Sequence, residues 1–443
     1  MPADCILIFD VGKTHSKASV VDLSTGIVKK SNQLTNIQTD TSEYQIIDVE
    51  NIWRWFLEQI SELNVSFPIK QITVTTHGAA AVVITDNKTL FPVIDYEAEI
   101  YDQVNNQYNE IRPDYSETGS LNLPQGLNLG RQLFYLQKTY PSLWDSAQLI
   151  LMLPQYFCWK LSGIAATEIS FLGCHTDLWD VHNSQYSSLV EQCNWQSLFP
   201  TIKKAGDQLG TVLSTIATQT GLRDDTVILN GIHDSNASLV PYLQTNHDNL
   251  NVISTGTWAV FHAIKKENQP LTSSRKIMHS IDYKNNPVSS MRFMGGREWK
   301  EIQNNSTNNG SLKDIEHVIA SQCYAYPALS SAKKLTPHQL SALATLYLAL
   351  MSRYCLDQLD CSGDIIVEGS FTNNIKYLQL LQLLSPKQKV LYSLDPAGTT
   401  FGASRLSSHS IKWPAVQLMV IDKIILLGLK EYYKSWKQKL PEQ

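Results

Sequence analysis

Three short turns of glycine and hydroxyl residues constrain this chain most, because each directly follows an apolar run that predicts a β-strand. The turns are Asp10-Val11-Gly12-Lys13-Thr14, Ser254-Thr255-Gly256-Thr257 and Glu368-Gly369-Ser370-Phe371-Thr372. Glycine lets a backbone approach an anion closely, and the nearby hydroxyl and N–H groups can hold phosphate oxygens. One such turn is usually only a turn, but three of them favour a phosphate-binding α/β protein.

The residues around these turns predict alternating strands and helices. Strands are expected over Cys5–Asp10, Lys17–Leu23, Ile27–Leu34, Gln71–Thr75, Thr226–Asn230, Asn251–Ser254, Trp258–Ile264, Asp364–Val367 and Lys389–Ser393. Helices are expected over Val49–Leu63, Pro337–Leu359, Asn373–Leu384 and Ile421–Lys439, with a surface loop at Asn304–Ser311. We therefore expect two α/β halves, 1–225 and 226–443, each beginning with a β-hairpin and joined by a hinge near Arg223–Thr226.

Composition and charge narrow the function classes. The 36 basic and 41 acidic residues are scattered and leave a net charge of −5, so neither nucleic acid nor an anionic membrane is an expected partner. No run reaches the roughly 20 apolar residues that a membrane helix needs, and the N-terminus lacks a signal-peptide pattern. The seven cysteines are widely spaced without a CxxC pair, which is typical of reduced thiols without a zinc site. We expect a cytoplasmic protein.

Two familiar nucleotide-binding fingerprints are excluded. Gly12-Lys13-Thr14 looks like the end of a Walker A loop, but the first glycine of that loop is missing. The chain also lacks the GxGxxG pattern of dinucleotide-binding folds.

Two carboxylates stand where chemistry is possible. Asp10 ends the first strand beside a glycine turn, where it could hold the hydration shell of Mg²⁺ or simply cap the turn. Asp234, at a strand–helix junction, could accept a proton from a substrate hydroxyl or serve as a helix N-cap. We interpret His233 beside it as structural. The residues alone leave both alternatives open.

Taken as an ordered set from Ile6 to Leu406, the motifs resemble the FGGY family of carbohydrate kinases, in particular its rhamnulokinase-like and less characterised sugar kinase branches. This resemblance implies two actin-like (ribonuclease H-like) ATPase domains with a cleft between them. It also implies ATP and Mg²⁺, and a small ketose or polyol, a pentulose or hexulose, as substrate. The N-terminal domain would carry the sugar-binding residues and first phosphate motif, and the C-terminal domain the catalytic aspartate and the adenosine site. A homodimer is the commonest oligomer for such a protein.

The resemblance also implies roles for individual residues. The implied ATP-side residues are Asp10 for the metal, Gly12, Lys13, Thr14, Thr255, Gly256 and Thr257 for the phosphates, and Gly295, Gly296, Gly369, Ser370 and Asn373 for adenosine. The implied sugar-side residues are His77, Gly78, Asp95, Glu97, Thr176 and Asp234, the last being the catalytic base.

Three positions depart from the family pattern: Lys13 replaces a small hydroxyl residue, Glu97 an arginine and Glu368 a glycine. These departures support an alternative hypothesis, a catalytically weak or inactive nucleotide- or sugar-binding sensor on the same fold. A third hypothesis, an actin- or chaperone-like ATPase with a protein partner, is disfavoured by the sugar-side motifs His77-Gly78 and Asp95.

Overall fold

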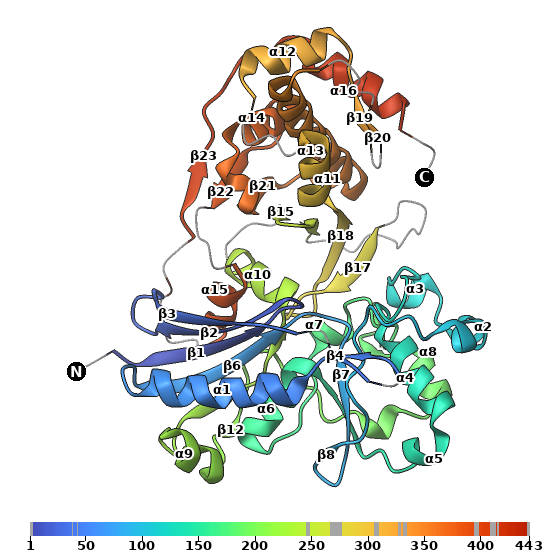
Figure 1. Cartoon of the computed structure of the whole chain (residues 1–443), viewed down its shortest axis with the longest axis vertical. Helices are drawn as coiled ribbons and strands as arrows, with labels where there is room; N and C mark the ends of the chain where they lie inside the picture. The colour runs from blue at the N-terminus through green and yellow to red at the C-terminus, as the bar shows by residue number, and fades with distance from the viewer. Residues whose placement is uncertain are drawn as a thin grey trace.

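The computed structural model describes residues 3–37, 39–41, 43–244, 249–265, 277–304, 310–326, 329–330, 335–393, 398–407, 413 and 416–440. Within these residues the chain forms two lobes, each built around a seven-stranded sheet. Helices α10 (Asp234–Leu243) and α15 (Gly398–Ser404) lie between the lobes (Figure 1). The expected α/β fold with two sheet-containing domains is confirmed.

The first sheet has the strand order β12-β13-β6-β1-β2-β3, with β14 paired to β6. Its strands are β1 (Cys5–Val11), β2 (His15–Asp22), β3 (Val28–Thr35), β6 (Ile69–Thr76), β12 (Gln208–Thr211), β13 (Val227–Leu229) and β14 (Ile232–His233). The antiparallel meander β1–β2–β3 is the one that the sequence predicts, and β1 pairs in parallel with β6. Because β13 and β14 also pair with β6, this sheet continues past residue 225 and past the hinge expected near Arg223–Thr226.

Strand β1 is apolar because both of its faces are buried. Residues at its odd positions pack against α1 (Val49–Asn64) and α6 (Leu153–Ser162), and Phe9 stacks on Phe56 with ring centroids 3.8 Å apart. Residues at its even positions face α10 and α15, and Ile8 shares a core cluster with Val240. Since side chains alternate along a strand, Asp10 ends on the face that carries α10.

The second sheet has the order β17-β18-β16-β15-β21-β22-β23. Its strands are β15 (Leu250–Thr255), β16 (Ala259–Ile264), β17 (Met278–Ile281), β18 (Pro287–Phe293), β21 (Asp364–Gly369), β22 (Val390–Ser393) and β23 (Leu418–Val420). Its helices are α11 (Gly295–Gln303), α12 (Leu312–Ala320), α13 (Pro337–Leu359), η3 (Ser370–Asn373), α14 (Ile375–Leu384) and α16 (Leu429–Gln438). The hairpin β15–β16 with its parallel neighbour β21 repeats the arrangement of β1, β2 and β6, as expected from the sequence.

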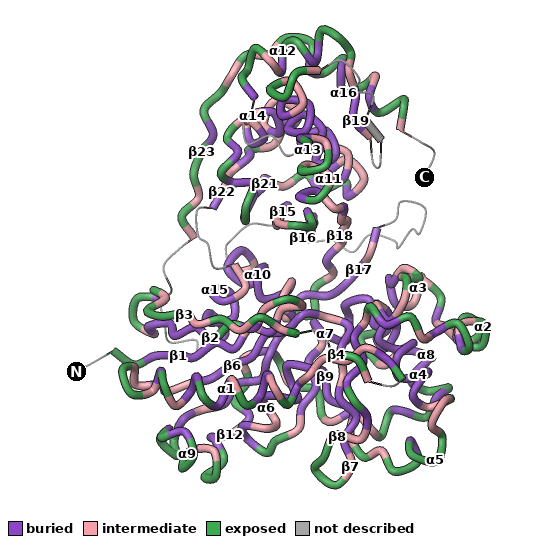
Figure 2. Tube along the Cα trace, in the orientation of Figure 1, coloured by how far each residue is buried: buried purple, intermediate pink, exposed green. Residues whose placement is uncertain are grey.

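The remaining elements belong to the first lobe, mostly on the side of α2 and α5 with α9 at the opposite end, apart from the pair β19–β20, which lies in the second lobe (Figure 1). They are β4 (Thr39–Asp40), β5 (Gln45–Ile46), β7 (Ala81–Thr85), β8 (Lys88–Thr89), β9 (Leu149–Met152), β10 (Trp179–Asp180), β11 (Gln185–Tyr186), β19 (Ala325–Tyr326), β20 (Leu329–Ser330), α2 (Asp102–Ile111), α3 (Tyr115–Thr118), α4 (Leu129–Thr139), α5 (Pro141–Trp144), α7 (Ile169–Leu172), α8 (Ser188–Gln192), α9 (Ser214–Thr220) and η1 (Gln196–Leu198). The burial pattern in Figure 2 follows these layers, with buried residues concentrated on the central strands and on α13.

Helices α10 and α15 touch through their backbones. A Cβ at Gly402 of α15 would overlap the carbonyl oxygen of Ala237 of α10, so only glycine fits at this crossing. The same pair shares its core with β1, through Ile6 and Ala403 among others. This contact fixes where α10 begins relative to the end of β1.

The structure differs from one expectation about the C-terminal half, the start of its last helix, and leaves another, a surface loop, largely outside the described residues. The helix expected over Ile421–Lys439 starts only at Leu429, because the preceding residue, Gly428, takes a positive φ of 78° and acts as the N-cap. The loop expected at Asn304–Ser311 falls largely on 305–309, which lie outside the described residues. Among the described residues, every helix is too short or too polar to cross a membrane.

Candidate active site

Asp234 lies in a cavity of about 250 Å³ between the start of α10, the start of α15 and the second sheet. Other residues that line it are Ser254 at the end of β15, Glu368 and Gly369 at the end of β21, and Gly398 at the start of α15. The ends of the two central strands of the second sheet therefore face the first turn of α10. The cavity combines the predicted base with two of the three glycine turns.

The position of Asp234 distinguishes between its two possible roles, a proton acceptor and a helix N-cap. Asp234 is the first residue of α10, and His233 holds the N-cap position. The Asp234 carboxylate accepts the N–H of Ser235 at 2.5 Å, and its side chain is 31% exposed. Burial raises the pKa of Asp234, against the opposing influence of His77 and of the hydrogen bonds from Ser235. The carboxylate is therefore presented to the cavity without being the N-cap.

Asp10 lies close to Asp234, as the alternation along β1 requires. Burial, reinforced by the charge of Asp234, raises the pKa of Asp10 to about 7. A buried carboxylate whose proton affinity is raised by a neighbouring carboxylate suits a divalent cation, because Mg²⁺ sites in proteins commonly use one or two carboxylates.

The predicted sugar-side residues His77, Gly78 and Asp95 come together beside this pair. The rings of His77 and Tyr96 meet edge-on with centroids 5.7 Å apart. A Cβ at Gly78 would lie 2.6 Å from Nε2 of His233, so the missing side chain lets β14 pack against this turn. Burial lowers the pKa of His77, to which Asp234 and Asp95 are electrostatic neighbours.

The side chain of Lys13 points to the sugar-side loop, whereas the sequence places it among the phosphate ligands. Its ammonium contacts both carboxylate oxygens of Asp95 and lies 3.3 Å from Glu97. The turn itself keeps its expected form, since Gly12 N–H donates to the carbonyl of His15 at 2.9 Å. Gly12 and the exposed Thr14 thus remain at the turn, and only the lysine side chain leaves it.

Thr176, expected at the sugar, is not brought into the cavity. It is buried, its hydroxyl donates to the carbonyl of Leu172, and the same oxygen accepts the N–H of Leu178 at 3.1 Å. A hydroxyl satisfied within its own turn has a structural role. The neighbouring Asp177 is likewise structural, because its carboxylate is paired with Arg112 at 2.8 Å.

Behind Gly78, the side chains of Cys174, His175 and His233 form a buried cluster whose donor atoms all lie within 4.8 Å of one another. Burial raises the pKa of Cys174 to about 12 and lowers the pKa values of both histidines to about 3. The cluster is therefore an uncharged wall at neutral pH, which agrees with a structural interpretation of His233.

The second and third glycine turns are tied together by Thr255. Its hydroxyl donates to the carbonyl of Glu368 at 2.5 Å and accepts the N–H of Phe371 at 3.0 Å. Gly369 takes a φ of 86°, and a Cβ on it would overlap the carbonyl oxygen of Thr255. Glycine is thus required at 369 by both conformation and space.

Beyond these turns lies a second cavity, of about 760 Å³, at the residues that the sequence assigns to adenosine and phosphate binding. The predicted residues that line it are Gly256, Thr257, Gly296, Ser370 and Asn373. Gly295 lies beneath it, since a Cβ at 295 would be 2.9 Å from Ala259. Glu368 lines the Asp234 cavity instead, where Tyr242 of α10 donates to its carboxylate at 2.8 Å.

Sequence reasoning missed Arg292. It pairs on β18 with Val260 of β16, a residue that lines the Asp234 cavity. Burial lowers the pKa of the Arg292 guanidinium, and Tyr96 and Cys174 of the first lobe are its electrostatic neighbours. Arg292 belongs to none of the motifs, so only its place on the cavity-facing side of the sheet reveals it.

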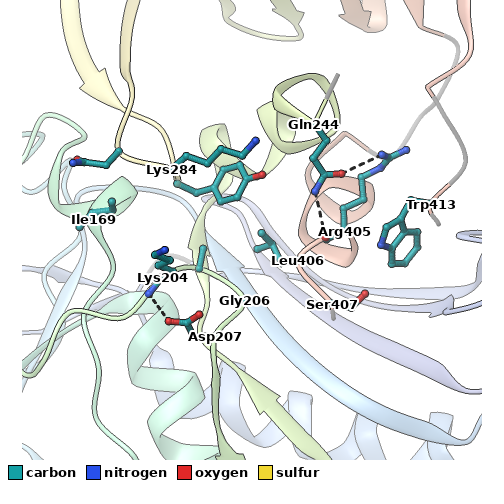
Figure 3. A pocket seen from close by; sticks show the side chains of 13 residues that line it. Ile169, Lys204, Gly206, Asp207, Gln244, Lys284, Arg405, Leu406, Ser407 and Trp413 are labelled. Carbon is teal, nitrogen blue, oxygen red and sulfur yellow. Dashed lines mark hydrogen bonds between the residues drawn. The ribbon is translucent and has the colours of Figure 1, made fainter. Parts of the chain in front are cut away.

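A separate cavity of about 570 Å³ lies among α10, α15 and the β17–β18 turn (Figure 3). Its polar side chains include Lys204, Gln244, Lys284 and Arg405, and Gln244 donates to the carbonyl of Arg405 at 3.5 Å. Neither Asp10 nor Asp234 lines it, so the candidate active site is the cavity at the start of α10.

Comparison with known proteins identifies the family of this chain. The chain matches the model of the FGGY family of carbohydrate kinases, N-terminal domain, over residues 5–241, and that of carbohydrate kinase FGGY, C-terminal domain, over 247–414. The L-fuculokinase of Salmonella typhi is 26% identical over 269 residues, or 59% of this chain and 56% of that protein. The rhamnulokinase of Oceanobacillus iheyensis is 24% identical over 58% of this chain and 55% of that protein. These alignments span little more than half the length of the curated relatives.

Solved structures match along the whole chain. A carbohydrate kinase from Novosphingobium aromaticivorans has a TM-score of 0.91 and 30% identity, covering 99% of both chains. Xylulose kinase from Rhodospirillum rubrum has a TM-score of 0.80 at 15% identity, covering 98% of both chains, and shares the fold. Both family models together with these structures show the expected actin-like ATPase fold, and the chain belongs to the FGGY family of carbohydrate kinases.

Proposed function

We propose that this protein is an ATP-dependent carbohydrate kinase that transfers the γ-phosphate to a hydroxyl of a small ketose or polyol, a pentulose or hexulose. The observation that carries the proposal is the place of the Asp234 carboxylate. It opens into a cavity bounded by the glycine turns of the second lobe, with His77 of the sugar side as its electrostatic neighbour.

Each lobe would have its own part in this reaction. The first lobe would hold the sugar and the first phosphate turn, and the second would hold adenosine in the cavity lined by Gly296, Ser370 and Asn373. We propose that the domains divide within α10, between the strands of the first sheet and those of the second, so that Asp234 stands at their junction.

Asp234 would act as the general base. A loose phosphoryl-transfer transition state asks the base mainly to orient the hydroxyl and accept its proton. The raised pKa of Asp234 makes it a better proton acceptor than an exposed aspartate, while the hydrogen bonds from Ser235 hold its orientation. Asp10 would hold Mg²⁺, which neutralises charge on the phosphate oxygens when bound. We place this activity in the cytoplasm, where ATP is available and the free cysteines stay reduced.

The names of the relatives suggest the first sugars to test: L-fuculose, rhamnulose and xylulose. ADP release should depend on one of these sugars and on Mg²⁺. Asp234→Asn should lower kcat by about 10²- to 10⁴-fold while calorimetry still detects MgATP binding. If the wild type binds sugar and MgATP without releasing ADP, the protein is a sensor. If Asp234→Asn keeps near-normal turnover, Asp234 is not the general base.

A further inference from the structure

We propose that Lys13 is a positioning residue of the sugar site, and that Lys13 and Glu97 are an exchanged pair of charges between the first phosphate turn and the sugar loop. The sugar loop is defined here as residues 95–97. This inference rests on the proposed kinase function and adds to it a determinant of sugar binding.

The charge of Lys13 is met within the sugar loop. Its ammonium donates hydrogen bonds to both carboxylate oxygens of Asp95 and lies 3.3 Å from a carboxylate oxygen of Glu97 as an ion pair. The same ammonium stands 4.6 Å from the centre of the Tyr96 ring. The lysine is therefore directed at the sugar loop by three neighbouring residues.

The ion pair between Lys13 and Asp95 is largely shielded from water. The Lys13 side chain is 22% exposed and that of Asp95 only 5%. A shielded ion pair holds its geometry more firmly than a surface pair, and removing one partner leaves an uncompensated buried charge. Without Lys13, the neighbouring carboxylates of Asp95 and Glu97 would repel each other in the same loop.

Asp95 is also fixed from its own loop. Its carboxylate accepts the N–H of Glu97 at 2.9 Å, and its N–H donates to the carbonyl of Gln45 at 2.9 Å. Lys13 completes this support from the opposite side, so the carboxylate presents its remaining lone pairs to a sugar hydroxyl in one orientation. Lys13 therefore acts through Asp95.

The motif that this loop resembles has an arginine at position 97 and a hydroxyl residue at position 13. Here the cation is Lys13 on the phosphate turn and the anion is Glu97 in the sugar loop. The positive charge beside the sugar loop is therefore kept, but a different residue carries it. The sugar loop is thereby tied to the turn between β1 and β2. The sugar site should consequently depend on Lys13 in this chain, where the family arrangement would depend on residue 97.

A charge-exchange experiment tests this. Lys13→Thr, Glu97→Arg and the double variant are compared with wild type for the KM of whichever of L-fuculose, rhamnulose and xylulose the wild type phosphorylates, and for MgATP affinity measured calorimetrically without sugar. Each single variant should raise the sugar KM at least about tenfold, with MgATP affinity within about twofold of wild type. The double variant should recover to within about threefold of wild type, and Lys13→Arg should stay near it.

Lys29→Thr is the matched control. Lys29 pairs at 3.0 Å with Asp22, another shielded carboxylate of the first lobe. Lys29 lies at the end of β3 remote from the Lys13 turn, because Thr35 pairs with His15 whereas Val28 pairs with Val21. Its loss should leave both kinetic constants unchanged. Thermal melts of all variants establish that they fold.

The outcomes that overturn the inference are distinct. A tenfold loss of MgATP affinity in Lys13→Thr with an unchanged sugar KM would make Lys13 a phosphate ligand. Unchanged constants would leave it without a role, and additive defects in the double variant would refute the exchange. A wild type that phosphorylates none of the sugars would refute the proposed function instead, and the MgATP affinity of Lys13→Thr would still decide whether Lys13 binds phosphate.

Discussion

The guanidinium of Arg292 lies 5.2 Å from the ring centre of Trp258, at the turn between β15 and β16, while its electrostatic neighbours Tyr96 and Cys174 belong to the other lobe. An arginine held over an aromatic ring is oriented without losing its donors. Arg292 is thus placed to reach across to a sugar bound in the first lobe.

Replacing Arg292 by alanine should therefore raise the sugar KM at least about tenfold, with MgATP affinity within about threefold of wild type. Steady-state kinetics with calorimetry measures both. Arg54→Ala, on the exposed face of α1, is the control and should change neither. A fall in kcat alone would mean that Arg292 acts on the transferred phosphate and not on the sugar.

Gly369→Ala should destabilise the protein and weaken MgATP binding. The backbone conformation of Gly369, with φ 86° and ψ −159°, is essentially restricted to glycine and costs another residue about 1–3 kcal/mol. The overlap with the Thr255 carbonyl would also force the second and third turns apart. Urea unfolding and calorimetry provide the measurements. Gly210→Ala, whose Cβ would meet nothing closer than 3.7 Å, is the matched control, and equal behaviour of the two variants would contradict the argument.

Arg112→Met should lower the free energy of unfolding by about 3–5 kcal/mol, because it leaves a buried carboxylate without its cation. The partner, Asp177, is fully buried and accepts two hydrogen bonds from Arg112. The exposed pair Arg223–Asp225 gives the control, and Arg223→Met should leave the free energy of unfolding almost unchanged. A loss at Arg112 as small as this would show that Asp177 becomes protonated at little cost.

Glu168 gives the fold a pH dependence. Burial raises the pKa of its carboxyl from 4.5 to about 7, despite hydrogen bonds from the N–H groups of Ser170 and Phe171. A group that holds its proton more tightly when folded contributes fully below its unfolded pKa and loses that contribution as pH rises through its folded pKa. Between about pH 4.5 and 7 the wild type should therefore lose stability relative to Glu168→Gln, which does not titrate there. Denaturant midpoints at several pH values measure this, and a constant difference would contradict it.

Much of the fold could be predicted because its signals are local. The meander β1–β2–β3 follows from apolar runs separated by glycine turns, and Pro337–Leu359 is bounded in the sequence as in the structure, since Thr336 and Gln339 form a capping box. The boundary expected after residue 225 does not account for the pairing of β13 and β14 with β6. Pairing with a strand about 150 residues earlier leaves no local pattern in the sequence.

The sequence predicts the positions of the backbone turns in the candidate site better than it predicts the contacts of long side chains. The glycines lie where the turns place them, and Gly296, Ser370 and Asn373 do line one cavity. Lys13 could not be assigned to its partners, since its side chain reaches a loop more than 80 positions away. The bond from the Thr176 hydroxyl to the Leu172 carbonyl could not be predicted either, because a hydroxyl that bonds within its own turn has the same sequence pattern as one that binds a ligand.

The crossing at Gly402 has a mechanical consequence. Two helices in backbone contact cannot slide past each other without displacing main chain, so α10 and α15 are held in a fixed register at this crossing. Asp234 precedes Ala237 by three residues, about 4.5 Å along the axis of α10. Any residue larger than glycine at 402 would push the start of α10 away from α15, and the Asp234 carboxylate would be displaced with it.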